Sequence, residues 1–211
     1  MRRHPREERM GRKKSYDRAS LIDAAMALFR AHGFAGTSTA MLVEHLGVNR
    51  NSMYAEFGSK QGLFDAVVGA YETSVLTGHF GPLEAEGSGL EEVRALFRRL
   101  AAAAAGPARG TGCLLCNTAV ELGGTAAPSE RVFVPKYLER IRGAIAGALE
   151  NARRRGELRG GVEVDIEASY LSASVLGMFV LIRAAASPAH IEATAEGACR
   201  HLDALAAAPA E

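Results

Sequence analysis

The sequence predicts an all-α fold, and three features of its composition support this prediction. Alanine and leucine dominate, segments in which β-branched and polar residues alternate are nearly absent, and tryptophan is missing. With 211 residues, of which 48% are hydrophobic and 23% charged, the chain is long enough for one or two domains with a buried core. We expect about nine helices, divided between a three-helix N-terminal domain that contains a helix-turn-helix and a helical C-terminal domain.

Residues 1–17 are predicted to form a flexible basic arm. They are rich in arginine and lysine and lack the apolar centre that a secretory signal requires. An arm of this kind can follow the minor groove of DNA or extend into solvent, and both alternatives stay open. If it contacts DNA, the candidate contacts are Arg12, Lys13 and Lys14.

The first helix is expected from Arg18 to His32, where apolar residues follow helical spacing. Gly33 stands in the position expected of a C-terminal cap and should end this helix. We interpret the helix as a support for the segment that follows.

Residues 37–62 predict two short helices joined by a tight turn. Apolar residues share one side of a helix over about Thr39–Leu46 and one side of a second over about Arg50–Phe57. Ser38 or Thr39 can cap the first helix and Asn49 the second, because a short side-chain oxygen reaches the backbone N–H two or three residues on. A glycine between them allows positive φ at the turn. This is the geometry of a helix-turn-helix.

The second of these helices has an outward face suited to reading DNA. Arg50, Asn51 and Ser52 point away from its apolar edge, and the major groove matches arginine to guanine and asparagine to adenine. A polar outward face can also be only a solvated surface. The charge distribution favours DNA, since residues 1–62 hold 11 Lys and Arg against 6 Asp and Glu, whereas the rest hold 14 against 18.

The segment GFAGTSTAMLVEHLGVNRNSMYAEFGSKQGLFDAV resembles the DNA-binding segment of the TetR family of bacterial transcriptional regulators, without a gap. The resemblance covers roughly residues 18–68. In that family, threonines ahead of the second helix, the tyrosine of the third and the lysine that opens the fourth hold DNA phosphates. With the first turn of the reading helix included, the candidate DNA-binding residues are Thr37, Thr39, Asn49, Arg50, Asn51, Ser52, Tyr54 and Lys60.

One departure from the family pattern concerns Glu56, which stands where a histidine or an aromatic residue is commoner. An acid so close to phosphate is unfavourable. We therefore expect the Glu56 carboxylate to point aside or to accept a hydrogen bond from a cytosine amino group.

The resemblance also implies a function. A TetR-type regulator, expected to be a repressor, would bind a palindromic double-stranded operator as a homodimer and be released by a small-molecule or electrophile inducer. Residues 18–62 would then form the DNA-binding domain and residues 63–211 the regulatory and dimerisation domain. The protein is expected in the cytoplasm, with no cofactor and no membrane partner, since no apolar run reaches the ~20 residues of a membrane span.

Ser59 can cap a helix that links the two domains. We expect it to run to about Leu76, before Gly78 and the Gly/Pro-rich stretch up to Gly89 interrupt it. Lys60 lies in its first turn, where the helix dipole disfavours a cation, and a DNA phosphate would explain its presence there.

Five further helices are expected in the C-terminal half from periodic apolar residues and the breakers between them. Their expected bounds are Leu90–Ala105, Gly112–Gly123, Ser129–Arg155, Asp165–Ala186 and Ala189–Ala207.

The helix that begins at Asp165 is apolar on almost every side from Leu171 to Ile182, so it must be buried almost all round. Pairing with a second chain in a four-helix interface would achieve this, and so would an internal core position. The candidate interface residues are Ala173, Leu176, Gly177 and Val180.

The three cysteines are Cys113, Cys116 and Cys199, and few thiols in an intracellular chain are usually buried and inert. Cys113 and Cys116 form a C-x-x-C motif, yet no second ligand pair has zinc spacing, so no metal site is expected. The GCLL stretch is similar to a segment of some TetR-family members, including electrophile sensors, in which a cysteine takes the position of Cys113. Packing and thiol sensing therefore remain alternatives.

No enzyme motif is present, so the protein is not expected to be an enzyme. The competing hypotheses are a CxxC-dependent thiol oxidoreductase and an architectural protein that binds DNA without sequence preference. An inducer pocket would be lined by scattered residues, for which the candidates are Phe97, Leu100, Cys113, Leu114, Leu115, Val120, Tyr137, Phe179 and Arg183.

Overall fold

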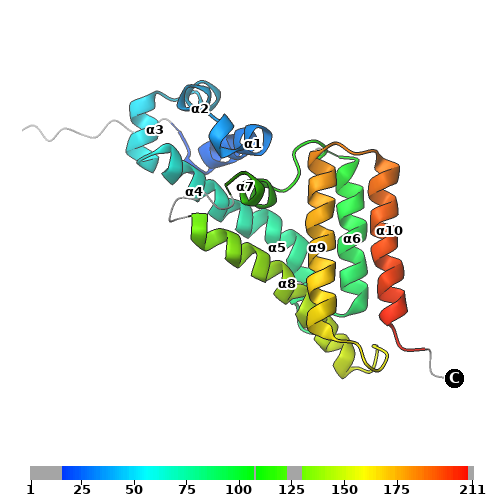
Figure 1. Cartoon of the computed structure of the whole chain (residues 1–211). Coiled ribbons are helices and arrows are strands. Elements are labelled where there is room, and N and C mark those ends of the chain that lie inside the picture. The colour runs from blue at the N-terminus through cyan, green and yellow to red at the C-terminus, as the bar shows by residue number, and fades with distance from the viewer. Residues whose placement is uncertain (1–15, 107, 123–129, 209–211) are drawn as a thin grey trace, which may run out of the picture.

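The computed structural model describes residues 16–106, 108–122 and 130–208. All secondary-structure elements in these ranges are helices. An isolated β-bridge joins Leu158 and Ala206. The all-α prediction is confirmed. In chain order, the elements are α1 Arg18–Gly36, α2 Thr39–Leu46, α3 Arg50–Phe57, α4 Lys60–Tyr71, the π-helical turn η1 Glu72–Leu76, α5 Thr77–Glu84, α6 Leu90–Ala104, α7 Leu114–Leu122, α8 Glu130–Arg154, α9 Val164–Arg183 and α10 Pro188–Leu205 (Figure 1).

The helices form two groups, with α1 to α3 at one end and α6, α9 and α10 side by side at the other (Figure 1). The rod formed by α4, η1 and α5 extends from the first group into the second, and α8 packs along α5. When the rod is counted as one helix, the described part of the chain contains nine helices.

The N-terminal group is held together by aromatic packing. Phe29 of α1 and Phe64 of α4 are fully buried, and their ring centroids lie 5.0 Å apart in an edge-to-face arrangement. Phe34 packs 4.9 Å from Phe64. Such pairs stabilise by more than their buried area alone. They fix the start of α4 against α1.

The predicted helix caps are present: the side chains of Ser38, Asn49 and Ser59 each accept the backbone N–H of the residue three positions on. Asp17, which was not predicted, caps α1 in the same way. Gly47 has φ of 63° at the end of α2, in the left-handed conformation that a glycine adopts without strain. The helix-turn-helix bounds are those expected from the sequence.

The expected break of the linking helix near Gly78 is wrong. The helix continues from Leu76 through α5 to Glu84, and it includes Pro82. Glycine costs about 1 kcal/mol in a helix interior, but burial of Phe80 and Leu83, which are 0% and 2% exposed, outweighs that cost. Tertiary packing therefore overrides the local propensity of this segment.

Some other helix ends also differ from the expected positions. The helix expected up to Ala186 ends at Arg183, and Ala185 then adopts a positive φ of 51°. The last helix begins at Pro188, whose fixed φ suits the first helical position, after Ser187 as its cap. The C-terminal group is held by the buried side chains of α9, which are Ala168, Leu171, Val175, Met178, Phe179 and Ile182.

By length and composition α9 could span a membrane, with a mean hydropathy of 1.4 over its most apolar window. The expectation that no apolar segment reaches that length is therefore wrong. Here α9 packs on one side against α6, α8 and α10, and only 33% of that window is buried.

We predict that Phe80→Ala lowers the free energy of unfolding by roughly 3–5 kcal/mol, because the phenyl ring is fully buried where the helix was expected to have ended. Urea denaturation followed by circular dichroism measures this change. Val120→Ala is the control, since Val120 is 76% exposed and its loss should cost less than about 0.5 kcal/mol. If the two variants have the same stability, Phe80 is not part of the core.

Candidate functional site

The first turn of α3 presents its polar side chains outward. The Asn49 side chain accepts the Ser52 N–H at 2.8 Å and so caps the helix. Arg50 and Asn51 are exposed, and with Asn49, Ser52 and Ala55 they line a hollow on the surface. This side of α3 is therefore free to enter the major groove.

A hydrogen-bonded group links α3 to α2 on the same side. Arg50 Nη2 donates to the Tyr54 hydroxyl at 3.3 Å, and the Tyr54 and Thr39 hydroxyls lie 3.4 Å apart. The Arg50 guanidinium also lies 5.3 Å from the centre of the Tyr54 ring. Bonds to Thr39 and Arg50 lower the pKa of Tyr54, since they stabilise its phenolate form. The three side chains are thus already arranged as neighbouring donors.

Two residues of the predicted site take other roles. Thr37 is fully buried, and its hydroxyl donates to the Gly33 carbonyl at 2.6 Å, so its side chain is not available to a phosphate in this conformation. Glu56 points aside, as one of the two alternatives proposed, because its carboxylate pairs with Arg18 Nε at 3.3 Å.

Lys60 lies at the start of α4 with its ammonium group 4.3 Å from the centre of the Phe34 ring. Burial lowers the pKa of Lys60, and the carboxylate of Glu121 acts in the opposite direction. The cation is therefore positioned by an aromatic ring beside the backbone N–H groups of a helix N-terminus, where anions bind.

The two domains are tied at the C-terminal end of α1 by three charged side chains. Arg30 of α1 donates to Thr111 Oγ1 and to the Gly112 carbonyl, both at 3.0 Å. Arg183 of α9 donates in return to the carbonyls of Arg30 at 2.8 Å and of Ala31 at 3.0 Å. A cation at a helix C-terminus also complements the helix dipole.

Glu121 of α7 provides the third tie. It accepts the backbone N–H groups of Phe34 at 3.0 Å and Ala35 at 2.7 Å, directly after the break at Gly33. Sequence reasoning missed Arg30 and Glu121 and placed Arg183 only in a pocket. These contacts join residues more than 80 positions apart, so helical periodicity carries no signal for them.

The residues suggested for an inducer pocket fall into three places. Leu100 and Phe179 line a cavity of about 210 Å³ between the domains. Val120 and Arg183 line a separate hollow of about 300 Å³ together with Cys116. The remaining candidates are buried in the core of the C-terminal domain, and they are Phe97, Cys113, Leu114, Leu115 and Tyr137.

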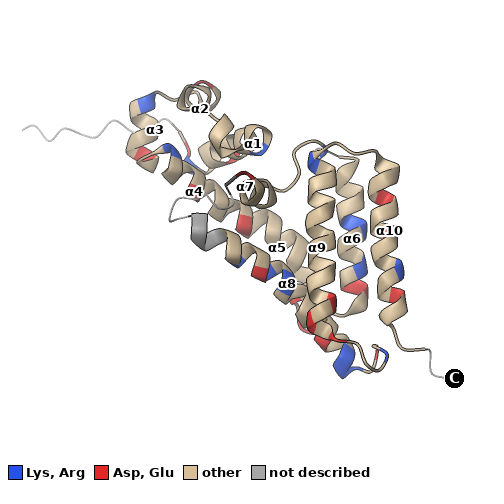
Figure 2. Ribbon diagram, in the orientation of Figure 1, with Lys and Arg blue, Asp and Glu red and all other residues tan. Residues whose placement is uncertain are grey.

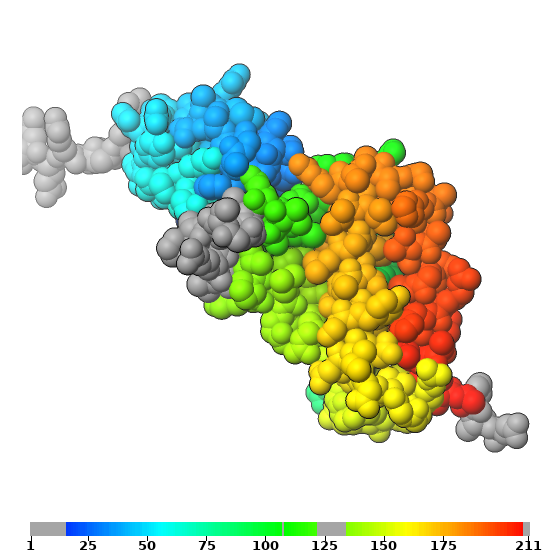
Figure 3. Space-filling view, viewed as in Figure 1, coloured from blue at the N-terminus to red at the C-terminus, as the bar shows by residue number. Residues whose placement is uncertain are grey.

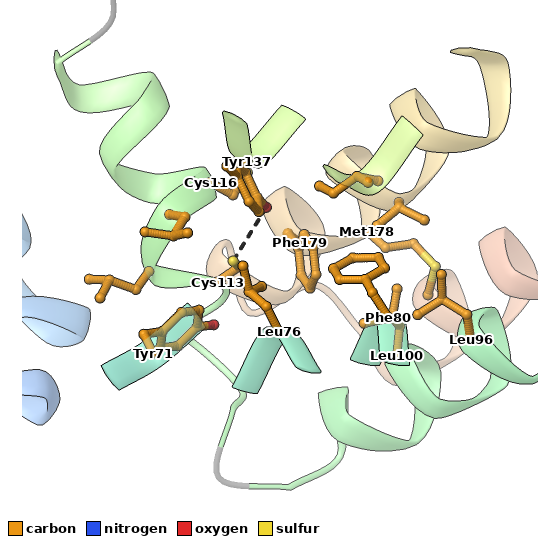
Figure 4. Close-up of a cluster of buried hydrophobic side chains, with 14 of the residues drawn as sticks. Tyr71, Leu76, Phe80, Leu96, Leu100, Cys113, Cys116, Tyr137, Met178 and Phe179 are labelled. Carbon is orange, nitrogen blue, oxygen red and sulfur yellow. Dashed lines mark hydrogen bonds between the residues drawn. The ribbon is translucent and has the colours of Figure 1, made fainter. Parts of the chain in front are cut away.

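The three cysteines are free thiols and all are buried. Cys113 Sγ lies 3.4 Å from the Tyr137 hydroxyl, and Tyr71 approaches from the other side (Figure 4). Burial raises the pKa of both tyrosines, and that of the Cys116 thiol to about 11. Within the described ranges, no group of three or more potential ligands could hold a metal ion.

The outer side of α9 is apolar and exposed. Ile166, Tyr170 and Val180 are 66%, 53% and 50% exposed, and Ala173 and Gly177 lie between them. Spacings of four and three residues place all five on one side of the helix. Leu176 is half-buried. Figure 3 shows α9 and α10 together on one face of the molecule, and Figure 2 shows α9 without charge between its ends.

Two known protein families match this chain, one in each of its two domains. Residues 21–67 match the family described as "Bacterial regulatory proteins, tetR family". Residues 89–198 match the domain described as "Tetracyclin repressor-like, C-terminal domain".

Two curated relatives cover most of this chain. The HTH-type transcriptional regulator YezE of Bacillus subtilis (strain 168) is 31% identical over 182 residues, which cover 84% of this chain and 91% of YezE. The HTH-type transcriptional repressor ComR of Escherichia coli (strain K12) is 30% identical over 178 residues, which cover 84% of each chain.

A solved structure is similar over nearly the whole chain. This is the TetR family regulator CifR, as a cysteine mutant in complex with 26-bp double-strand operator DNA. It is 25% identical, with a TM-score of 0.76 and coverage of 90% of this chain and 98% of that chain. Together with the two family matches and the relatives, it leads to one conclusion: the chain belongs to the TetR family of bacterial transcriptional regulators and contains its DNA-binding domain.

Proposed function

We propose that the protein is a repressor that binds a palindromic operator as a homodimer in the cytoplasm and that an inducer releases it. The observation that supports this most is the exposed first turn of α3. Beside it lie the guanidinium group of Arg50 and the hydroxyl groups of Tyr54 and Thr39, which are linked by hydrogen bonds. The relative ComR is named a repressor, and CifR was solved with operator DNA.

The residues of this surface divide into two roles. Arg50 and Asn51 are exposed at the start of the helix that enters the groove, so we assign them to base edges. Thr39 at the start of α2 and Lys60 at the start of α4 flank that helix, and Tyr54 lies on it beside Thr39; we assign their hydroxyl and ammonium groups to phosphates. Asn49 and Ser52 support the first turn through the cap that they form.

We predict that Asn51→Ala relaxes sequence preference at one operator position and costs roughly 1–3 kcal/mol there, because a base-edge bond is lost. Arg50→Ala should do the same at a neighbouring position.

Lys60→Ala should instead weaken binding to operator and random DNA alike and reduce the log–log salt slope by about 1. Titrations by fluorescence anisotropy at several salt concentrations measure both quantities.

The two assignments fail in different ways. An equal loss of affinity on all sequences would assign Asn51 to a phosphate. An unchanged salt slope would remove Lys60 from the phosphate contacts. Strong operator preference in the wild type would also argue against an architectural protein that binds DNA without sequence preference, since such a protein gains its affinity from charge alone.

Homodimerisation is proposed through the outer side of α9, with α10 beside it. The candidate residues Ala173, Gly177 and Val180 are exposed there, and a Cβ built at Gly177 would meet nothing within 4 Å. Exposed apolar surface of this extent commonly marks an interface. Small residues on it allow a second helix to approach closely, and a two-fold axis would place two α3 helices on one palindrome.

Gly177→Glu is predicted to dissociate the dimer and to abolish operator binding without a large loss of helicity. Two-fold symmetry repeats the charge, and each carboxylate would lose its water in a dry interface. Gly69→Glu is the control, because Gly69 is also an exposed helical glycine with open space around it. Analytical ultracentrifugation gives the oligomeric state, and a Gly177→Glu variant that sediments as a dimer would contradict this placement.

Release by an inducer requires that ligand binding alters the distance between the two α3 helices of the proposed dimer. The rod from Lys60 to Glu84 connects the proposed phosphate contact to the regulatory core, so a ligand that tilts it would move α3. A ligand with different affinities for the two arrangements changes DNA affinity by the same factor, with a coupling of roughly 1–3 kcal/mol.

If the signal is an electrophile, Cys113 is the proposed target. Cys113→Ser should keep operator affinity but lose release by a maleimide reagent, whereas Cys199→Ser should behave as wild type. Cys116 should react slowly at pH 7, because a thiol whose pKa is raised to about 11 is almost entirely protonated there. Anisotropy of labelled operator before and after treatment measures release.

If neither thiol reagents nor hydrophobic small molecules change operator affinity, and Cys113→Ser matches wild type, the proposed sensor role is lost. Turnover of a dithiol substrate would support an oxidoreductase instead. The high pKa of Cys116 argues against that chemistry, which needs a thiolate as the nucleophile.

A further inference from the structure

A cavity of about 210 Å³ lies at the junction of the two domains. Its walls come from α1, α4, η1, α5, α6, α9 and the loop before α7. At about 30 Å³ per molecule, this is the space of roughly seven waters. Its polar lining is Arg30, Tyr71 and His79, and its apolar lining includes Leu100, Phe179 and Ile182.

Arg30 is incompletely satisfied in this setting. Its Nη2 donates to Thr111 and Gly112, and its guanidinium lies 6.0 Å from the centre of the Tyr71 ring. Its Nε–H is buried and has no hydrogen-bond partner among the described residues. A buried donor without a partner costs free energy, so an acceptor placed beside it would be bound favourably.

The charge of the lining points to the same kind of ligand. Arg30 and His79 are basic, and no carboxylate is among the residues that line the cavity. Burial and the nearby Arg99 lower the pKa of His79, so the neutral imidazole is favoured, and it keeps one N–H to donate. A cation would meet a guanidinium with no compensating acid, whereas an anion would be paired.

We propose that this cavity binds a small monocarboxylate whose carboxylate accepts the Arg30 Nε–H and whose apolar part contacts Leu100, Phe179 and Ile182. The size of the cavity suits an acid such as benzoate or hexanoate. The regulatory consequence of this binding rests on the proposed repressor function, and it identifies the chemical class of the inducer.

Arg30 links a ligand in this cavity directly to the DNA-binding domain. It belongs to α1 of the DNA-binding domain, yet it lines a cavity whose opposite wall is α9. A carboxylate that accepts the Nε–H draws the guanidinium toward the cavity and so alters the Nη2 bonds to Thr111 and Gly112. The ligand therefore acts on the attachment of α1 without first having to move the whole α4–α5 rod.

Isothermal titration of the purified full-length protein tests the assignment. Benzoate and hexanoate should bind at least tenfold more tightly than benzamide and hexanamide, their neutral counterparts of equal size. Arg30→Met should remove this preference for the acids. Arg98→Met is the matched control, since Arg98 is an exposed arginine on α6 whose loss removes the same charge away from the cavity.

Because Arg30→Met also breaks structural bonds, a second variant leaves Arg30 untouched. Ala103 lines the cavity and Ala102 lies on the exposed side of the same helix. Ala103→Ile should occupy part of the cavity and weaken benzoate at least tenfold, while Ala102→Ile should bind it as wild type does.

Acids that bind no better than amides, or not at all, would overturn the assignment, and so would an Ala103→Ile variant with unchanged benzoate affinity. Operator titrations separate this proposal from the proposed function. Failure to bind operator without ligand would overturn the repressor role while the carboxylate titration still supports the cavity. Operator affinity that benzoate leaves unchanged, in a protein shown to bind it, would overturn the link to α1.

Discussion

The end of α1 is bonded directly to the C-terminal domain. At Gly33 the backbone turns with φ of 74°, and a Cβ there would lie 2.5 Å from the Glu121 carboxylate. Carbonyl groups before this break are satisfied by Arg183, and N–H groups after it by Glu121. The helix end thus finds its missing partners in another domain. The join consists of charge-assisted bonds to backbone, which fix direction more than apolar contact does.

This construction bears on how a signal can travel. The aromatic packing of Phe29 against Phe64 joins α1 to the start of α4. Arg183 closes α9, the helix whose outer side is the proposed dimer interface, and it holds α1 directly. The proposed dimer interface, the cavity and the DNA-binding domain are therefore connected through few side chains. The connections made by Arg30, Arg183 and Glu121 are polar and have discrete partners, which is the kind of contact that switches between two arrangements.

Much of the DNA-binding domain could be predicted from sequence because its determinants are local. Caps such as Ser38 and Asn49 act over three residues, and the bounds of α2 and α3 follow from them. Sequence reasoning missed the burial of Thr37, although its hydroxyl bonds to the Gly33 carbonyl only four residues back, because it interprets the break at Gly33 only as a helix end. The course of the chain through Gly78 could not be predicted, since it depends on packing of α5 against α6 and α8. For the same reason, scattered candidate pocket residues such as Leu100 and Val120 were foreseen only individually, and the structure places them in different cavities.

The π-helical turn η1 lies between α4 and α5, and Thr77 N–H reaches back to the Glu72 carbonyl across it. Such a turn holds one residue more than an α-helical turn, and one residue corresponds to about 100° of rotation around a helix axis. Everything beyond Glu72 is thereby rotated relative to Lys60 at the other end of the rod. The rotation between the two domains therefore depends on the residue inserted at this turn, together with the bonds that Arg183 and Glu121 make to the end of α1.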